Sequence, residues 1–123
     1  PTAKHPPLSG ATLGTKNWFG AVVGSRSNLH QQIGRVCAEL GAAFNPTLTV
    51  MDATRVLAGG GPTGGSLSLV KPMDLVGVAT DPVAADAWGA SLLELAPGRL
   101  AHLAIAEQLG LGTAAWQGLV VEV

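Results

Sequence analysis

Apolar residues recur at helical spacing between Ser27 and Asn45, and polar residues occupy the opposite side of the same stretch. Ser27 is a suitable N-cap, while Gly41 and then Asn45-Pro46 provide a stop near the other end. The periodicity predicts an amphipathic helix over this segment. Its apolar stripe consists of Leu29, Ile33, Val36, Cys37, Leu40 and Phe44.

Three shorter apolar runs are typical of β-strands. Residues 48–52 form a short run that includes the β-branched Thr49 and Val50 and is bounded by residues that break secondary structure. Residues 75–80 are nearly all apolar, as in a strand that is covered on both faces. The last strand is predicted at residues 119–123, which read LVVEV.

Two further helices are predicted in the second half of the chain. Asp81-Pro82 supplies an N-cap side chain and a proline for the first helical position, so a helix is expected over residues 83–95. Another is expected from about residue 98 to residue 109. The order of these elements predicts a single α/β domain over residues 1–123, with helices packed on a parallel or mixed sheet. In such sheets ligands bind at the carboxyl ends of the strands, where Asp52 and Asp81 are expected to lie.

The chain carries little charge for its length. Charged residues make up 12% of its 123 residues, against roughly 25% in typical soluble domains. We therefore expect a homo-oligomer, or a surface that another polypeptide covers. The net charge of −1 argues against nucleic acid as a partner, and no apolar run is long enough for a membrane span.

The first residue and the single cysteine bear on compartment and cofactors. The chain begins at Pro1 without an initiator Met, which suggests that a longer parent has been trimmed. Cytoplasmic location and export after removal of a signal peptide both stay open. Because Cys37 is the only cysteine, we expect no internal disulfide and no iron–sulfur cluster held by this chain alone, while other cofactors stay open.

Residues 57–65 read LAGGGPTGG, which is a glycine-rich stretch after an apolar run. No Lys follows in the register of a phosphate-binding P-loop, and the stretch does not run directly into an amphipathic helix as a dinucleotide fingerprint does. Two interpretations remain. The amides of Gly60, Gly61 and Gly64 could face an anion, or the stretch could be a connection without a ligand.

A succession of motifs runs through nearly the whole chain, namely PTAKH, TLGTKNWFG, NLHQQIG, NPTLTVMDATRVL, GGGPTGG, ATDPVAADAWGA and HLAIAEQLGLG. In this order the motifs resemble the C-terminal half of domain-of-unknown-function family 362. The resemblance implies a bacterial or archaeal protein; some members are fused or genetically linked to ferredoxin-type iron–sulfur domains, and some are exported by the twin-arginine route. Members of the family are usually longer, so an N-terminal half is expected to be missing. Lys4-His5-Pro6 stands where many members have Lys-His-His, which weakens the idea of a two-histidine ligand.

Several polar residues are candidates for a site. Two ammonium groups, an imidazole and an amide in the first segment would suit an anionic ligand, and they belong to Lys4, His5, Lys16 and Asn17. Asp52 is a candidate metal ligand or general base, and His5 and His30 are candidates for proton transfer. A carboxylate at Asp86 in an alanine-rich helix requires a partner, for which Arg55 or Lys16 is suitable. His102 reads as an ordinary core histidine.

Two functions are compatible with these residues. The first is a redox-linked or metal-assisted enzyme that acts on an anionic small molecule, with its site formed by the first loop, the Asp52 strand end, the glycine stretch and the helix start at Asp81. The second is a non-catalytic module that docks an iron–sulfur partner protein or assembles a complex. Metal or anion density at the strand ends would favour the enzyme, whereas an exposed apolar face with an empty polar edge would favour the module.

Overall fold

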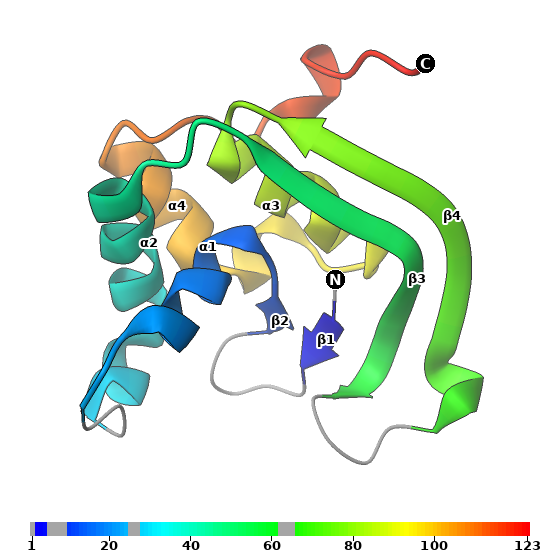
Figure 1. Cartoon of the computed structure of the whole chain (residues 1–123), viewed down its shortest axis with the longest axis horizontal. Coiled ribbons are helices and arrows are strands. Elements are labelled where there is room, and N and C mark those ends of the chain that lie inside the picture. The colour runs from blue at the N-terminus through cyan, green and yellow to red at the C-terminus, as the bar shows by residue number, and fades with distance from the viewer. Residues whose placement is uncertain (1, 5–9, 25–27, 62–65) are drawn as a thin grey trace.

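The computed structural model describes residues 2–4, 10–24, 28–61 and 66–123. Within these ranges a mixed four-stranded sheet has the order β2-β1-β3-β4, and helices pack beside it (Figure 1). β1 runs parallel to β3, whereas β1 and β2, and β3 and β4, are antiparallel pairs. The α/β class with a mixed sheet is therefore confirmed. The strands are β1 (Thr2–Lys4), β2 (Ala11–Thr12), β3 (Thr49–Gly61) and β4 (Val70–Ala79).

The helices form where caps and periodicity predict them. The helix after Asp81 begins with Pro82, and the long amphipathic helix ends where Asn45 adopts a left-handed conformation with φ of 40°. A 3-10 turn precedes that helix, and the expected N-cap Ser27 lies outside the described residues. The α-helices are α1 (Gly14–Asn17), α2 (Ile33–Phe44), α3 (Pro82–Leu92) and α4 (Ala101–Gln108), with 3-10 turns η1 (Trp18–Ala21), η2 (Asn28–Gln32), η3 (Leu67–Leu69), η4 (Pro97–Arg99) and η5 (Trp116–Gly118).

β3 is far longer than the sequence predicts, because it runs from Thr49 through the first three glycines of the glycine-rich stretch. Glycine weakens a strand, but β3 lies between two neighbours, so pairing with β1 and β4 holds its backbone in place. The expected strand at residues 119–123 is wrong, since that segment has no strand partner in the described structure.

The main core lies between one face of the sheet and α3. Ala53 and Val56 of β3 and Val83 of α3 are fully buried there, in contact with a larger apolar cluster. At Gly89 the contact is so close that a Cβ would lie 2.6 Å from the Met51 sulfur. The small residues of α3 thus allow the helix to approach β3 closely. A second cluster joins η1 to α2 through Phe19, Ile33 and Cys37.

Candidate functional site

Asp81 joins the start of α3 to a later segment of the chain. Its Oδ1 accepts hydrogen bonds from the amides of Val83 and Ala84, each at 2.8 Å, which confirms the predicted N-cap. Its Oδ2 accepts a third bond from the amide of Thr113 at 2.9 Å. A Cβ at the neighbouring Gly112 would overlap this carboxylate, so the tight approach requires glycine.

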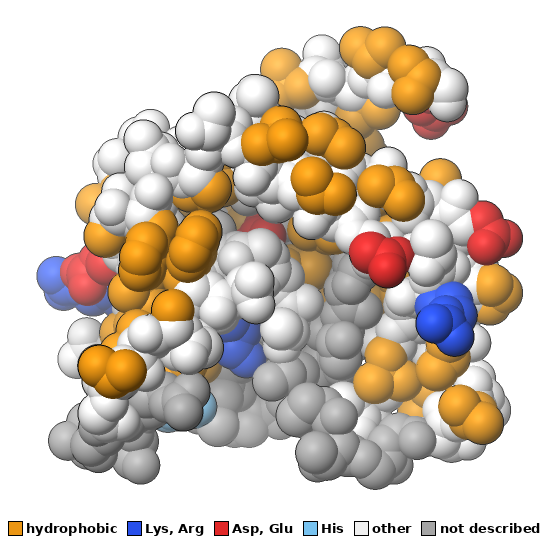
Figure 2. Space-filling model, viewed as in Figure 1, with side chains coloured by type: hydrophobic (Ala, Val, Ile, Leu, Met, Phe, Trp, Pro, Cys, Tyr) orange, Lys and Arg blue, Asp and Glu red, His pale blue; other side chains and the backbone are white. Residues whose placement is uncertain are grey.

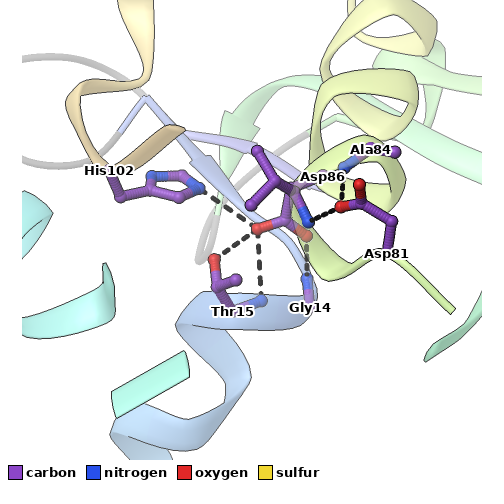
Figure 3. Close-up of polar contacts among 7 residues, drawn as sticks. Gly14, Thr15, Asp81, Ala84, Asp86 and His102 are labelled. Carbon is purple, nitrogen blue, oxygen red and sulfur yellow. Dashed lines mark hydrogen bonds and ion pairs between the residues drawn. The ribbon is translucent and has the colours of Figure 1, made fainter. Parts of the chain in front are cut away.

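Asp86 binds the start of α1 and a side chain of α4 (Figure 3). The Gly14 amide donates to Oδ1 at 2.7 Å, and the Thr15 amide donates to Oδ2 at 3.1 Å. Oδ2 also accepts from the Thr15 hydroxyl and lies 3.1 Å from His102 Nε2. Since Leu13, the N-cap of α1, offers no capping side chain, Asp86 supplies the acceptor that this helix start needs.

The cluster of Asp86, Thr15 and His102, called the Asp86 network below, is closed to solvent. The exposed fractions of these residues are 0%, 2% and 4%, respectively. Thr15 and His102 both bind the same carboxylate, so the three do not form a relay that leads to a substrate. The network instead fixes the position of α1, and with it the neighbouring Lys16 and Asn17. Arg55, one of the two partners that the sequence suggests for Asp86, instead lies exposed on β3, and the bonds described above come from other residues.

A small pocket of about 170 Å³ adjoins α1. Its lining includes Asn17 and Trp18 from the motif TLGTKNWFG, together with Thr49 and Val50 at the start of β3. The Trp18 ring is stacked on Phe44 with ring centroids 4.3 Å apart, which holds the ring in place. Asn17 therefore belongs to a hollow at the end of the sheet where β3 begins and β4 ends.

Beside this pocket the sheet exposes an apolar surface on the side away from α3. Gly77 and Met51 face α3, because Gly77 lies against the Trp88 ring, so their neighbours in the antiparallel register face outward. Figure 2 shows hydrophobic side chains gathered over β3 and β4. Three of these outward residues are Val50, Val76 and Val78, with exposed fractions of 63%, 62% and 63%. Together with Leu48, which precedes β3 and is 54% exposed, they are called the outer patch.

Asp52 lies on the same outward side, opposite Val76 in the register. Its Oδ1 accepts bonds from the Thr54 amide at 2.9 Å and the Thr54 hydroxyl at 2.8 Å. These bonds lower the pKa of the Asp52 carboxyl below its ordinary value, and Arg55 adds a smaller effect in the same direction. A lowered pKa makes the carboxylate a weaker proton acceptor, which reduces its suitability as a general base.

The glycine stretch and Asp52 lie toward opposite ends of β3. Asp52 lies near the first residue of β3 and Gly61 is the last. The stretch of strand between them is on the order of 30 Å long. The expectation that Asp52 ends its strand beside the glycines is therefore wrong. Lys4 does lie next to the glycines, because its backbone is the register partner of Gly61 in β3. Gly60 takes a φ of 69°, which side chains rarely allow.

The remaining candidates do not gather at one place. His30 lies exposed in η2, with its ring edge-on to Phe19 at 4.9 Å between centroids. His5 and Gly64 fall outside the described residues. Among residues 2–4, 10–24, 28–61 and 66–123, no three His, Cys, Asp or Glu side chains are placed to hold a metal ion together. In the same ranges, no helix is long and apolar enough to cross a membrane.

Thr15 and His102 are the polar residues that sequence reasoning missed. The available signal was Asp86 itself, because a carboxylate among alanines requires several donors. The first two amides of α1 need an acceptor from outside the helix, and a histidine in a predicted core helix needs a polar partner of its own. Asp86 is the partner of both residues.

A comparison with known proteins identifies the family of this chain. The family model described as "Domain of unknown function (DUF362)" matches residues 1–91. No curated protein and no solved structure matches the chain. The matched span includes Asn17, the glycine stretch and both aspartates of ATDPVAADAWGA, whereas His102 lies beyond it. Because the match covers well over half of the sequence, the chain belongs to the DUF362 family.

Proposed function

We propose that this chain is a docking module that binds a partner protein through the outer patch. The observation that carries the proposal is the exposure of three valines on adjoining strands, each more than three-fifths accessible. A contiguous apolar surface on a sheet is typical of an interaction site. Burying one such side chain completely contributes about 1.5–3 kcal/mol, so a partner that covers the patch gains a substantial apolar contact.

The pocket beside α1 gives this surface a polar neighbour. Val50 belongs both to the outer patch and to the pocket lining, so the two features are continuous. Interfaces commonly combine an apolar centre with a pocket that receives an anchoring side chain of the partner. Asn17 is placed to bond such a side chain, and the Asp86 network keeps α1 in position for it.

The resemblance to family 362 supplies the partner class, a ferredoxin-type iron–sulfur protein. With Cys37 as its only cysteine, the chain lacks the four thiolates that such clusters normally require. Iron and acid-labile sulfide that co-purify with the chain would thus come from a partner. This difference makes the proposal measurable.

The test compares tagged wild-type chain with Val50→Lys and Val76→Lys after purification from the source organism. We expect iron and sulfide in the wild-type sample, and at least a tenfold loss of both in each variant. Val23→Lys is the matched control, since Val23 is 93% exposed and lies outside the outer patch. Circular dichroism checks that all variants fold.

Two results would count against the docking proposal. One is wild-type chain that purifies without any stoichiometric partner. The other is a partner that remains bound to both outer-patch variants while Val23→Lys releases it.

An enzyme that acts on an anionic small molecule is the second candidate, and the pocket lined by Asn17 favours it. Calorimetry with phosphate and small carboxylates tests this function directly. If the pocket binds the anion through the adjacent ammonium group, Lys16→Ala should weaken binding by about 1.5–3 kcal/mol, the range for hydrogen bonds to charged groups. Unchanged affinity in the variant would remove this candidate.

A further inference from the structure

The outer edge of β4 has no strand beside it in the described structure. β4 is the last strand in the sheet order, so its second row of backbone groups is open. A groove of about 390 Å³ lies along this edge, lined by residues of β4, of α3 and of the segment 119–123. The amide of Leu119 donates to the Trp116 carbonyl. Among the described residues, no backbone hydrogen bond joins residues 119–123 to β4.

Only part of this edge is suitable for pairing with another strand. Pro72 has no amide hydrogen, Lys71 adds a charge, and Asp74 adopts a φ of 53° where the register with β3 shifts. At the other end, Asp81 already begins the next helix. The usable window is therefore residues 75–79, which read Leu-Val-Gly-Val-Ala and carry no charge.

We propose that this window pairs with the same window of a second copy, antiparallel, about a twofold axis at Gly77. The sequence is nearly symmetric about that glycine. Val76 would then face Val78 of the other copy, and the large Leu75 would face the small Ala79. A twofold interface requires a surface that complements itself in this way.

The local packing is compatible with this arrangement. Val76 and Val78 point outward, whereas Gly77 lies against Trp88 on the helix side, so the twofold leaves the α3 helices of both copies on one face of the joined sheet. The two outer patches become one continuous surface. Edge pairing also satisfies open backbone groups, which an apolar ligand in the groove would not do.

Charge pairs test the register by sedimentation equilibrium. Val76→Lys/Val78→Lys places lysines opposite lysines, so the dimer should dissociate at least tenfold more readily than wild type. Val76→Lys/Val78→Glu places lysine opposite glutamate and should restore most of the affinity, because cross-strand opposite charges attract. Val50→Lys is the control, since Val50 is 63% exposed like Val78 but lies on the inner strand β3.

Disulfide formation tests the same register independently. A mixture of Val76→Cys chains and Val78→Cys chains should cross-link to heterodimers, since facing Cα atoms about 4.5–5.5 Å apart fall within disulfide range. Val50→Cys chains should stay uncross-linked. The native thiol does not interfere, because Cys37 is 2% exposed.

Several outcomes would overturn the proposal. Wild-type chain that stays monomeric at micromolar concentration is one, and a dimer that survives the double-lysine change is another. A third contrary outcome is that deletion of residues 119–123 abolishes the dimer while the charge pairs have no effect. That result would mean that residues 119–123, and not residues 75–79, hold the two copies together. Failure here is distinct from failure of the partner docking, because Val50→Lys removes the proposed partner but leaves this dimer intact.

Discussion

At the scale of single residues, Asp86 accounts for the charge in the middle of an alanine-rich helix. The carboxylate accepts bonds from the Gly14 amide and from the amide and hydroxyl of Thr15, and His102 Nε2 lies 3.1 Å from it. The contacts with Thr15 and His102 are buried, and the Gly14 bond is partly buried. The sequence predicts that Asp86 needs a partner and suggests Arg55 or Lys16, whereas the bonds described here come from Gly14, Thr15 and His102. The partners come from residues 71 and 72 positions earlier and 16 positions later, so no local pattern identifies them.

Asp86→Ala should lower the free energy of unfolding by about 3 kcal/mol or more, because each buried donor left without an acceptor costs about 1–3 kcal/mol. Urea unfolding followed by circular dichroism measures the change. Glu39→Ala is the control, since its bond to Arg35 lies on the exposed side of α2 and its loss should change little. Equal stability of the two variants would mean that the Asp86 network does not hold α1 in place.

Cys37 should make stability depend on alkaline pH. Burial raises the pKa of its thiol from 9.0 to about 11, so folding favours the neutral form. This contribution is complete below pH 9 and is lost as the pH rises toward 11. Unfolding curves from pH 8 to 11 should show a decline that Cys37→Ala reduces. A decline of the same slope in both proteins would contradict the assignment.

At the scale of elements, helices were predicted more accurately than strands. The Asp81-Pro82 start of α3 is set by local capping chemistry, which is readable from two residues. The extent of β3 depends on pairing with distant segments, as between Lys4 and Gly61, and glycines alone suggest a loop. Residues 119–123 show the same dependence. Their sequence is typical of a strand, but no strand of the described structure pairs with them.

Asp81 and Gly112 should be energetically coupled. Asp81→Ala removes the N-cap of α3 and should cost about 1 kcal/mol. Gly112→Ala should cost at least as much, because the added Cβ overlaps the Asp81 carboxylate. In the double variant that overlap is gone, so the combined loss should fall short of the sum by on the order of 1 kcal/mol. Additive losses in thermal unfolding would show that the two residues act separately.

At the scale of the whole molecule, the candidate residues divide between two ends of the sheet. The pocket with Asn17 and the outer patch lie where β3 begins, and Lys4 with the glycines lies where β3 ends. From the sequence the Asp52 run reads as a short strand, which wrongly predicts that these residues lie together. Low charge did predict an uncovered apolar surface, but composition carries no information on which face it occupies.

A photo-crosslinking amino acid at position 50, compared with the same group at position 23, tests the central claim most directly. Both native valines are highly exposed, but only Val50 belongs to the outer patch. In cells of the source organism, position 50 should cross-link to one other polypeptide, identified by mass spectrometry as an iron–sulfur protein, while position 23 should not. Absence of any cross-link at position 50, or the same products at both positions, would contradict the docking function.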